Sequence, residues 1–241
     1  MESRAADPLF RKLDDSKILE TARALVKRIA ERFPDSGLRR LAAEVVEVGQ
    51  DVGRASRWLA RPIWPIRALS ILTILAIVTL AIAILVAADR RITPYQTLSD
   101  LLQGLDAGVN ELVLLGAGLW FLVSWEQRFK RRRALASLHA LRSLAHVVDM
   151  HQLTKDPERI LKAGPGPAAA IAPMTPAQLT WYLDYCSELL AMLSKLAALL
   201  VQDFDDPGTL AAVNEVENLC VGLSRKIWQK IGLVDARSTG A

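Results

Sequence analysis

The sequence predicts an all-α protein in which a two-span transmembrane helical hairpin carries a cytoplasmic antiparallel helical bundle or coiled coil. Three observations predict this fold class: an uncharged apolar run at 68–88, basic residues at one end of each apolar run, and apolar residues elsewhere that recur three and four positions apart. No segment alternates apolar and polar residues with period two, so no sheet is expected.

The composition narrows the class further. The chain of 241 residues is 51% hydrophobic and has a mean hydropathy of +0.22, which favours a protein partly in lipid. Its 30 Lys+Arg against 26 Asp+Glu leave a net charge of +4, too balanced for a polycation that wraps nucleic acid. Its 2 cysteines exclude a disulfide-rich scaffold.

The first predicted span is 68–88, in which only Ser70, Thr73 and Thr79 are polar. At ~1.5 Å per residue, a helix of this length covers about 30 Å, the thickness of the hydrocarbon core of a bilayer. The second predicted span is 107–125. Between them we expect a short outer loop, 89–106, with a short amphipathic helical stretch along the outer interface.

The basic residues predict the orientation. Arginines precede the first span, and a basic cluster follows the second, whereas the connection between them has only two arginines, which acidic residues offset. Because cytoplasmic flanks carry the Lys/Arg excess, both termini are expected in the cytoplasm of a bacterial inner membrane. The cluster, which also suits anionic lipid headgroups, comprises Arg128, Lys130, Arg131, Arg132 and Arg133.

The flanking segments read as helices. Segment 1–65 predicts a helical hairpin that is capped at Asp15 or Ser16 and broken at Phe33-Pro34, with a new cap in 35–37. Segment 128–162 continues the second span as a helix, and 163–174 is a Gly/Pro-rich linker. Segment 175–241 is expected to form a second helical hairpin. Its first helix begins at Thr175-Pro176, and its second helix begins at Thr209 and frays from Val234.

Apolar seams with heptad-like spacing run along these helices, and we expect them to pack against one another. The seam positions are Leu38, Leu41, Val45, Val48, Val52, Ala55 and Leu59; Ala134, Leu138, Leu141, Ala145, Val148 and Gln152; Leu179, Leu183, Cys186, Leu190, Leu193, Ala197 and Leu200; and Val213, Val216, Cys220, Leu223, Ile227 and Ile231.

No phosphate loop, nucleophile elbow, zinc-finger spacing or metalloprotease motif is present in the sequence, so no catalytic residue or cofactor is assigned. Small residues in the spans predict close helix packing instead of a nucleotide site. These are Gly108, Gly116 and Gly118 with Ala83 and Ala87. Glu111 is the one carboxylate within a predicted span, where it either contacts the outer interface or lines an ion path.

The three histidines, His139, His146 and His151, gather in one predicted helix. His146 and Asp149 share a face and form a weak metal or pH-sensing candidate, although ordinary hydrogen-bonded histidines are the simpler interpretation. Cys186 and Cys220 lie on apolar seams, which favours small buried hydrophobes over a redox pair.

These signals all concern anchoring and packing. The sequence therefore predicts a non-enzymatic membrane protein whose cytoplasmic bundle self-associates and binds a partner protein, with no nucleic acid, small-molecule substrate or cofactor. The alternative is an oligomeric two-span channel or pore-forming effector, with Glu111 in the path and the bundle as its gate. An enzyme built around His146 and Asp149 is the third hypothesis.

Overall fold

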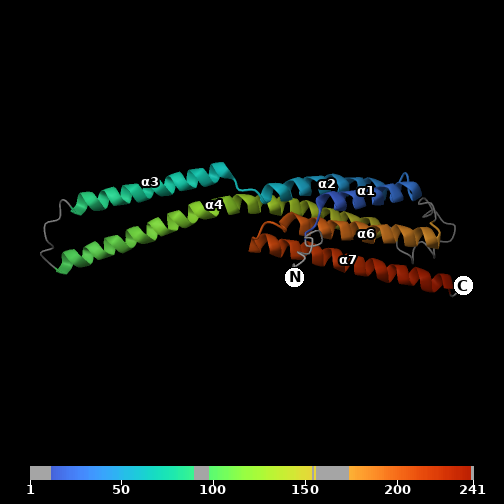
Figure 1. The fold of residues 1–241 in the computed structure, drawn as a ribbon. Coiled ribbons are helices and arrows are strands. Elements are labelled where there is room, and N and C mark those ends of the chain that lie inside the picture. The colour runs from blue at the N-terminus through green and yellow to red at the C-terminus, as the bar shows by residue number, and fades with distance from the viewer. Residues whose placement is uncertain (1–11, 90–97, 154, 156–173, 240–241) are drawn as a thin grey trace, which may run out of the picture. The chain divides into compact units, whose positions relative to one another are not determined.

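The computed structural model describes residues 12–89, 98–153, 155 and 174–239, and these residues form helices without a strand. The all-helical prediction is thus confirmed for this part of the chain. The helices, labelled in Figure 1, are α1 (Asp15–Arg32), α2 (Gly37–Leu59), α3 (Trp64–Asp89), α4 (Leu98–Leu153), α6 (Pro176–Val201) and α7 (Pro207–Thr239). The predicted linker at 163–174 lies almost wholly outside the described residues.

The chain divides into two compact units. Unit 1 combines Met1–Ala60 with Arg131–Ala241, and unit 2 is Arg61–Lys130. Helix α4 contributes its first part to unit 2 and its second part to unit 1.

The ends of the first two helices follow from local hydrogen bonds. Asp14 caps α1 by accepting a hydrogen bond from the backbone N–H of Ser16 at 2.9 Å, so the cap lies one residue before the predicted Asp15 or Ser16. The helix ends at Phe33, where Pro34 follows. Ser36 caps α2 as predicted, with its Oγ accepting from the N–H of Arg39 at 3.2 Å.

Helix α6 begins as the sequence predicts. Thr175 is its N-cap and Pro176 follows, and Thr175 and Gln178 form a reciprocal capping box with hydrogen bonds of 3.2 and 2.9 Å. The prediction for α7 was wrong at both ends. The helix begins at Pro207 because Asp206 provides the cap and proline suits the first helical position. It continues to Thr239, beyond the predicted fraying point at Val234, which is itself buried.

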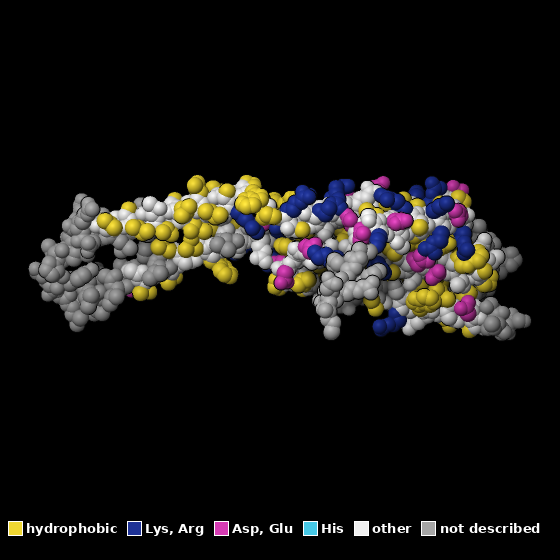
Figure 2. Space-filling model, viewed as in Figure 1, with side chains coloured by type: hydrophobic (Ala, Val, Ile, Leu, Met, Phe, Trp, Pro, Cys, Tyr) yellow, Lys and Arg dark blue, Asp and Glu magenta, His cyan; other side chains and the backbone are white. Residues whose placement is uncertain are grey.

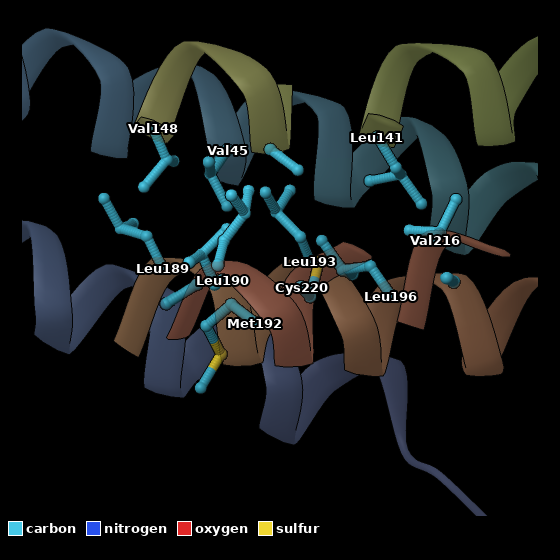
Figure 3. Packing of buried hydrophobic residues seen from close by; sticks show 14 of the residues in the cluster. Val45, Leu141, Val148, Leu189, Leu190, Met192, Leu193, Leu196, Val216 and Cys220 are labelled. Atoms are coloured by element: carbon cyan, nitrogen blue, oxygen red, sulfur yellow. The ribbon is translucent and has the colours of Figure 1, made fainter. Parts of the chain in front are cut away.

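The core of unit 1 lies around α6, which contacts α1, α2 and α7. Figure 3 shows side chains from α4 and α2 meeting those of α6 and α7, among them Leu141, Leu193 and Leu196. The predicted seam positions are buried in this core, with Val48 only partly buried. Burying a leucine side chain contributes about 1.5–3 kcal/mol, so the seams account for the association of these helices.

Two contacts bring α2 close to α6. A Cβ at Gly49 would lie 3.0 Å from Leu19 Cδ2 and 3.4 Å from Leu196 Cδ1, so a side chain there would require these two leucines to shift slightly. About two turns further on, the buried hydroxyl of Ser56 donates a hydrogen bond to the carbonyl oxygen of Leu199 at 2.8 Å. The hydroxyl is satisfied, as a buried polar group must be.

Unit 2 contains α3 and the first part of α4. Within it the hydroxyl of Ser70 donates to the carbonyl oxygen of Leu122 at 3.4 Å, which joins the start of α3 to α4. Helix α4 begins at Leu98 and runs without a break, so the predicted separate stretch before 107 is instead the first part of this long helix. No proline occurs between Pro94 and the end of α4 at Leu153, so nothing interrupts its helical hydrogen bonding.

Candidate functional site

The most distinctive surface of the molecule is apolar. Figure 2 shows hydrophobic side chains gathered over α3, whereas charged side chains are spread over unit 1. The exposed large apolar residues of unit 2 are Trp64, Leu69, Ile71, Leu72, Leu75, Val78, Ile82, Val86, Val109, Val113, Leu114, Trp120, Phe121, Trp125 and Phe129. Within the described residues, two helical stretches are long and apolar enough to cross a membrane by length and composition. This surface is the candidate site of unit 2.

The carboxylate of Glu126, in α4, binds residues at the start of α3 and a lysine of its own helix. Glu126 accepts hydrogen bonds from Arg67 Nε at 2.6 Å and from the backbone N–H of Ile63 at 3.2 Å. Lys130 Nζ lies 3.0 Å from Oε1 of Glu126, the oxygen that also accepts from Ile63, whereas Arg67 contacts Oε2. Glu126 therefore joins the start of α3 to α4 and offsets two of the positive charges.

Four of the five residues in the predicted basic cluster contact other side chains of the protein. Lys130 is buried against Glu126, and the guanidinium of Arg128 lies 5.1 Å from the ring centroid of Phe121. The guanidinium of Arg133 lies 4.7 Å from the ring centroid of Trp58, a cation–π contact. Arg131 pairs with Asp206, and Arg132 is exposed.

Asp206 is the most completely satisfied carboxylate in unit 1. Its side chain is fully buried at 0% exposure, and both oxygens lie 2.9 Å from Arg131 Nε, with a further contact from Nη2. Oδ2 also accepts from the N–H and the hydroxyl of Thr209, at 2.9 and 2.8 Å. Burial acts to raise the pKa of Asp206, but the hydrogen bonds from Arg131 and Thr209 outweigh it and hold the pKa below its usual range.

The small residues predicted to pack between the spans make no such contact within the described part of the chain. A Cβ added at Gly108, Gly116 or Gly118 would meet no described atom within 4 Å, and Ala83 is exposed. The side chain of Ala87 lies outside the described residues. Packing through these positions stays a prediction, as does the role of Glu111, which lies in α4 but whose side chain is also outside the described part.

The histidines do not converge. His139 lines a small hollow beside Arg142 and Glu215, and His146 is exposed. His151 instead packs on Gly37, where an added Cβ would lie 2.5 Å from its Cε1, and its Nδ1 is 3.5 Å from the hydroxyl of Tyr182. Burial, together with Arg40 and Lys155, lowers the pKa of His151.

Asp149 accepts a hydrogen bond from Gln152 of its own helix, so the weak metal candidate His146 and Asp149 gains no ligand from another helix here. The described residues hold no group of three or more His, Cys, Asp or Glu side chains that would suit a metal ion. Cys186 and Cys220 are both buried and unpaired in a disulfide. Burial raises the pKa of Cys186 to about 12 and that of Cys220 to about 11, so both thiols are protonated at neutral pH.

Sequence reasoning missed Glu126 and Asp206. Each had a local signal: Glu126 precedes Lys130 by one helical turn, the spacing of a helical ion pair. Asp206-Pro207 has the residue types of an N-cap and first helical position. Their partners on distant segments, Arg67 and Arg131, had no such signal.

The chain was compared with known families and structures. No protein-family model, curated protein or solved structure matches it.

Proposed function

We propose that this chain is a membrane-anchored helical protein whose two spans, 68–88 and 107–125, hold a bundle that self-associates and binds a partner protein. The observation that supports the anchor best is the exposure of large apolar side chains along the described part of α3. Leu69, Leu72 and Leu75 are exposed, whereas most leucines in the helices of unit 1 are buried. A surface of this size calls for lipid or another protein as its environment.

Lipid is the environment that fits α3. The helix is apolar on all sides, and it has no acidic residue in its first turn and no basic residue in its last. A helix that packed on a protein core would keep a polar face for water. Because lipid surrounds a span, apolar residues on every side are expected there.

The proposed topology places both termini in the cytoplasm of a bacterial inner membrane. Arg67 lies next to the start of the first span, and the basic cluster follows the second. The bond network of Glu126 supports this arrangement because it keeps Arg67 and Lys130 together at the same end of unit 2. We assign recognition to the bundle because its ion pairs, such as Arg28 with Glu188 and Arg131 with Asp206, join its helices to one another.

Topology is tested by labelling single cysteines in the full chain. In a background with Cys186→Ala and Cys220→Ala, one cysteine is introduced at Glu31, Gln96 or Glu215. Sealed vesicles are treated with a membrane-impermeant maleimide. We expect Glu31→Cys and Glu215→Cys to label from the same side and Gln96→Cys from the other.

Self-association and partner binding are tested separately. The detergent-solubilised full chain is measured by analytical ultracentrifugation, with the detergent contribution subtracted, and a mass of two or more chains is expected. Labelling of positions 31 and 215 from opposite sides would overturn the hairpin, and a monomer at every concentration would overturn self-association. Neither outcome depends on the other.

A further inference from the structure

One end of unit 2 is rich in arginine and tryptophan, and in the proposed topology it is the end at which both spans reach the cytoplasm. Its segments 61–68 and 119–130 contain four cationic residues, three tryptophans and a single carboxylate, Glu126. The hydrogen bonds from Ile63 and Arg67 to Glu126 hold the two segments side by side. The contacts of each cation decide which of the four remain available to a ligand.

Two of the four cations contact Glu126. Lys130 is buried, and its Nζ lies 3.0 Å from Glu126 Oε1, so its charge is offset within the protein. Arg67 uses Nε for its contact with Glu126 Oε2 at 2.6 Å, but its side chain is 54% exposed. Its terminal nitrogens, Nη1 and Nη2, make no hydrogen bond with another described residue, so most N–H donors of this guanidinium stay available to a ligand.

The other two cations, Arg61 and Arg128, are exposed and form no ion pair with a described residue. Arg61 lies between α2 and α3, two residues before Ile63 and therefore close to Glu126. The guanidinium of Arg128 lies 5.1 Å from the ring centroid of Phe121, which is two turns back along α4. A guanidinium over an aromatic ring keeps the N–H groups at its edge, where they can donate to an anion.

Tryptophans indicate the depth of these cations in a bilayer. Trp64 is 71% exposed and Trp125 is 43% exposed, and they precede Arg67 and Arg128 by one helical turn. Indole rings at the end of an apolar span favour the headgroup level, because the ring is apolar while its N–H group needs a polar partner. The neighbouring arginines therefore lie at the level of the lipid phosphates.

We propose that this end of unit 2 binds the headgroups of anionic phospholipids through Arg61, Arg67 and Arg128, a set that shares only Arg128 with the basic cluster at 128–133. Guanidinium groups match phosphate oxygens in geometry and are weakly hydrated, so they pair well there. Charge selects the anionic class, because a zwitterionic headgroup brings a cation of its own and the one carboxylate here, Glu126, is already engaged. The proposal rests on the proposed function, since headgroups reach these arginines only if unit 2 lies in a bilayer.

The test measures which lipid the full chain prefers. The protein is reconstituted into phosphatidylcholine vesicles that contain a trace of spin-labelled phosphatidylglycerol or spin-labelled phosphatidylcholine, and electron spin resonance gives the fraction of each that the protein restricts in motion. We expect phosphatidylglycerol to be preferred about threefold at low ionic strength, because basic residues near the surface attract anionic headgroups. Salt at about 1 M should lower the preference, since the screening length falls to about 3 Å.

Arg61→Gln/Arg128→Gln should reduce the preference for phosphatidylglycerol by at least about half, because it removes two of the three proposed ligands. The matched control, Arg23→Gln/Arg225→Gln, removes the same charge from exposed arginines of unit 1 and should leave the preference unchanged. Equal amounts of restricted phosphatidylcholine in the two variants and the original chain verify that all three are embedded to the same extent.

Equal restriction of the two lipids by the original chain would overturn the proposal. A preference that survives Arg61→Gln/Arg128→Gln would also overturn it, as would one that falls equally in the control. The same spectra separate this failure from failure of the anchor. If phosphatidylcholine is restricted without a preference for phosphatidylglycerol, the anchor stands and only the headgroup assignment fails, whereas a chain that restricts neither lipid would overturn both.

Discussion

The two units differ in how far they bury the same types of apolar side chain. Leu193 in unit 1 is 0% exposed, whereas Leu72 in unit 2 is 67% exposed. The difference follows from how apolar residues are spaced. In α2, α6 and α7 they recur as seams that neighbouring helices can cover, but in α3 they occupy every side of the helix.

The energetic consequence is large. Fully burying one Leu, Ile or Val side chain contributes about 1.5–3 kcal/mol. The exposed set on α3 includes Leu69, Ile71, Leu72, Leu75, Val78, Ile82 and Val86. Even at partial exposure, their contact with water costs on the order of 10 kcal/mol, which is comparable to the whole stability of a domain. The comparison shows that unit 1 covers most of its large apolar side chains with its own helices, whereas unit 2 leaves many of them exposed.

The largest expected effect concerns the buried thiol of Cys186. In the full chain with Cys220→Ala in detergent micelles, maleimide should label Cys186 at least about a thousandfold more slowly than an exposed cysteine introduced at Glu215, because labelling requires unit 1 to open. The raised pKa of Cys186 slows the reaction further. The measurement is the labelling rate at pH 7 by mass spectrometry; rates within tenfold of the exposed control would contradict a closed core.

The second prediction compares one leucine from each unit. Leu193→Ala should lower the free energy of unfolding of unit 1 by about 2–5 kcal/mol, because it leaves a cavity in the core. Leu75→Ala removes the same atoms from an exposed position and should change it by less than about 0.5 kcal/mol. The readout is the rate of Cys186 labelling under native conditions. Equal effects of the two substitutions would remove the distinction between the units.

A smaller effect is expected at Asp206. Asp206→Asn keeps a good N-cap but loses the charged partner of Arg131, and should destabilise unit 1 by about 1 kcal/mol, since Arg131 is 44% exposed and partly screened. Asp206→Ala also loses the cap and should cost about 1 kcal/mol more. Thermal unfolding followed by circular dichroism measures both. Glu215→Gln, which removes an exposed pair with Arg142, is the control and should have almost no effect.

The smallest expected effect is the pH dependence of the stability that ionised Asp206 contributes to unit 1. The pKa of Asp206 in the folded protein lies below its value in the unfolded chain, so the ionised carboxylate stabilises the fold above about pH 4. As the pH falls through the folded pKa, that contribution is lost. The difference in unfolding free energy between the original chain and Asp206→Asn should therefore shrink below about pH 4, and a difference that is constant down to pH 2 would refute this assignment.

Much of the helical pattern could be predicted from the sequence because its causes are local. The cap at Ser36 and the capping box at Thr175 need only residues within one turn, and almost every predicted seam position of α2, α6 and α7 is buried. The seams nevertheless include only half of the buried residues of α6, because that helix is covered on more than one side. The errors were also local in origin. The predicted start of the last helix at Thr209 was two residues late, because Pro207 after Asp206 marks a helix start.

The candidate sites were less predictable. The basic cluster at 128–133 could be identified from the sequence, but most of its contacts could not. Two of its partners, Asp206 and Trp58, lie far from the cluster in the sequence, and only Glu126 and Phe121 lie within a few residues of it. His146 and Asp149 share a helical face, as predicted, yet Asp149 bonds within its own helix. Ligand convergence depends on neighbouring helices, whose rotation a single sequence does not reveal.

The sequence by itself determined that this protein is helical, where most helices begin, which faces are apolar and that 68–88 is too uniformly apolar for a surface helix. These properties depend on hydrogen bonds and periodicity within a few turns. Tertiary structure alone decided that α6 is central, that Arg131 is paired with a buried Asp206, and that Arg67 shares Glu126 with Lys130. Those outcomes depend on which helices become neighbours, and that is settled by the packing of the whole chain.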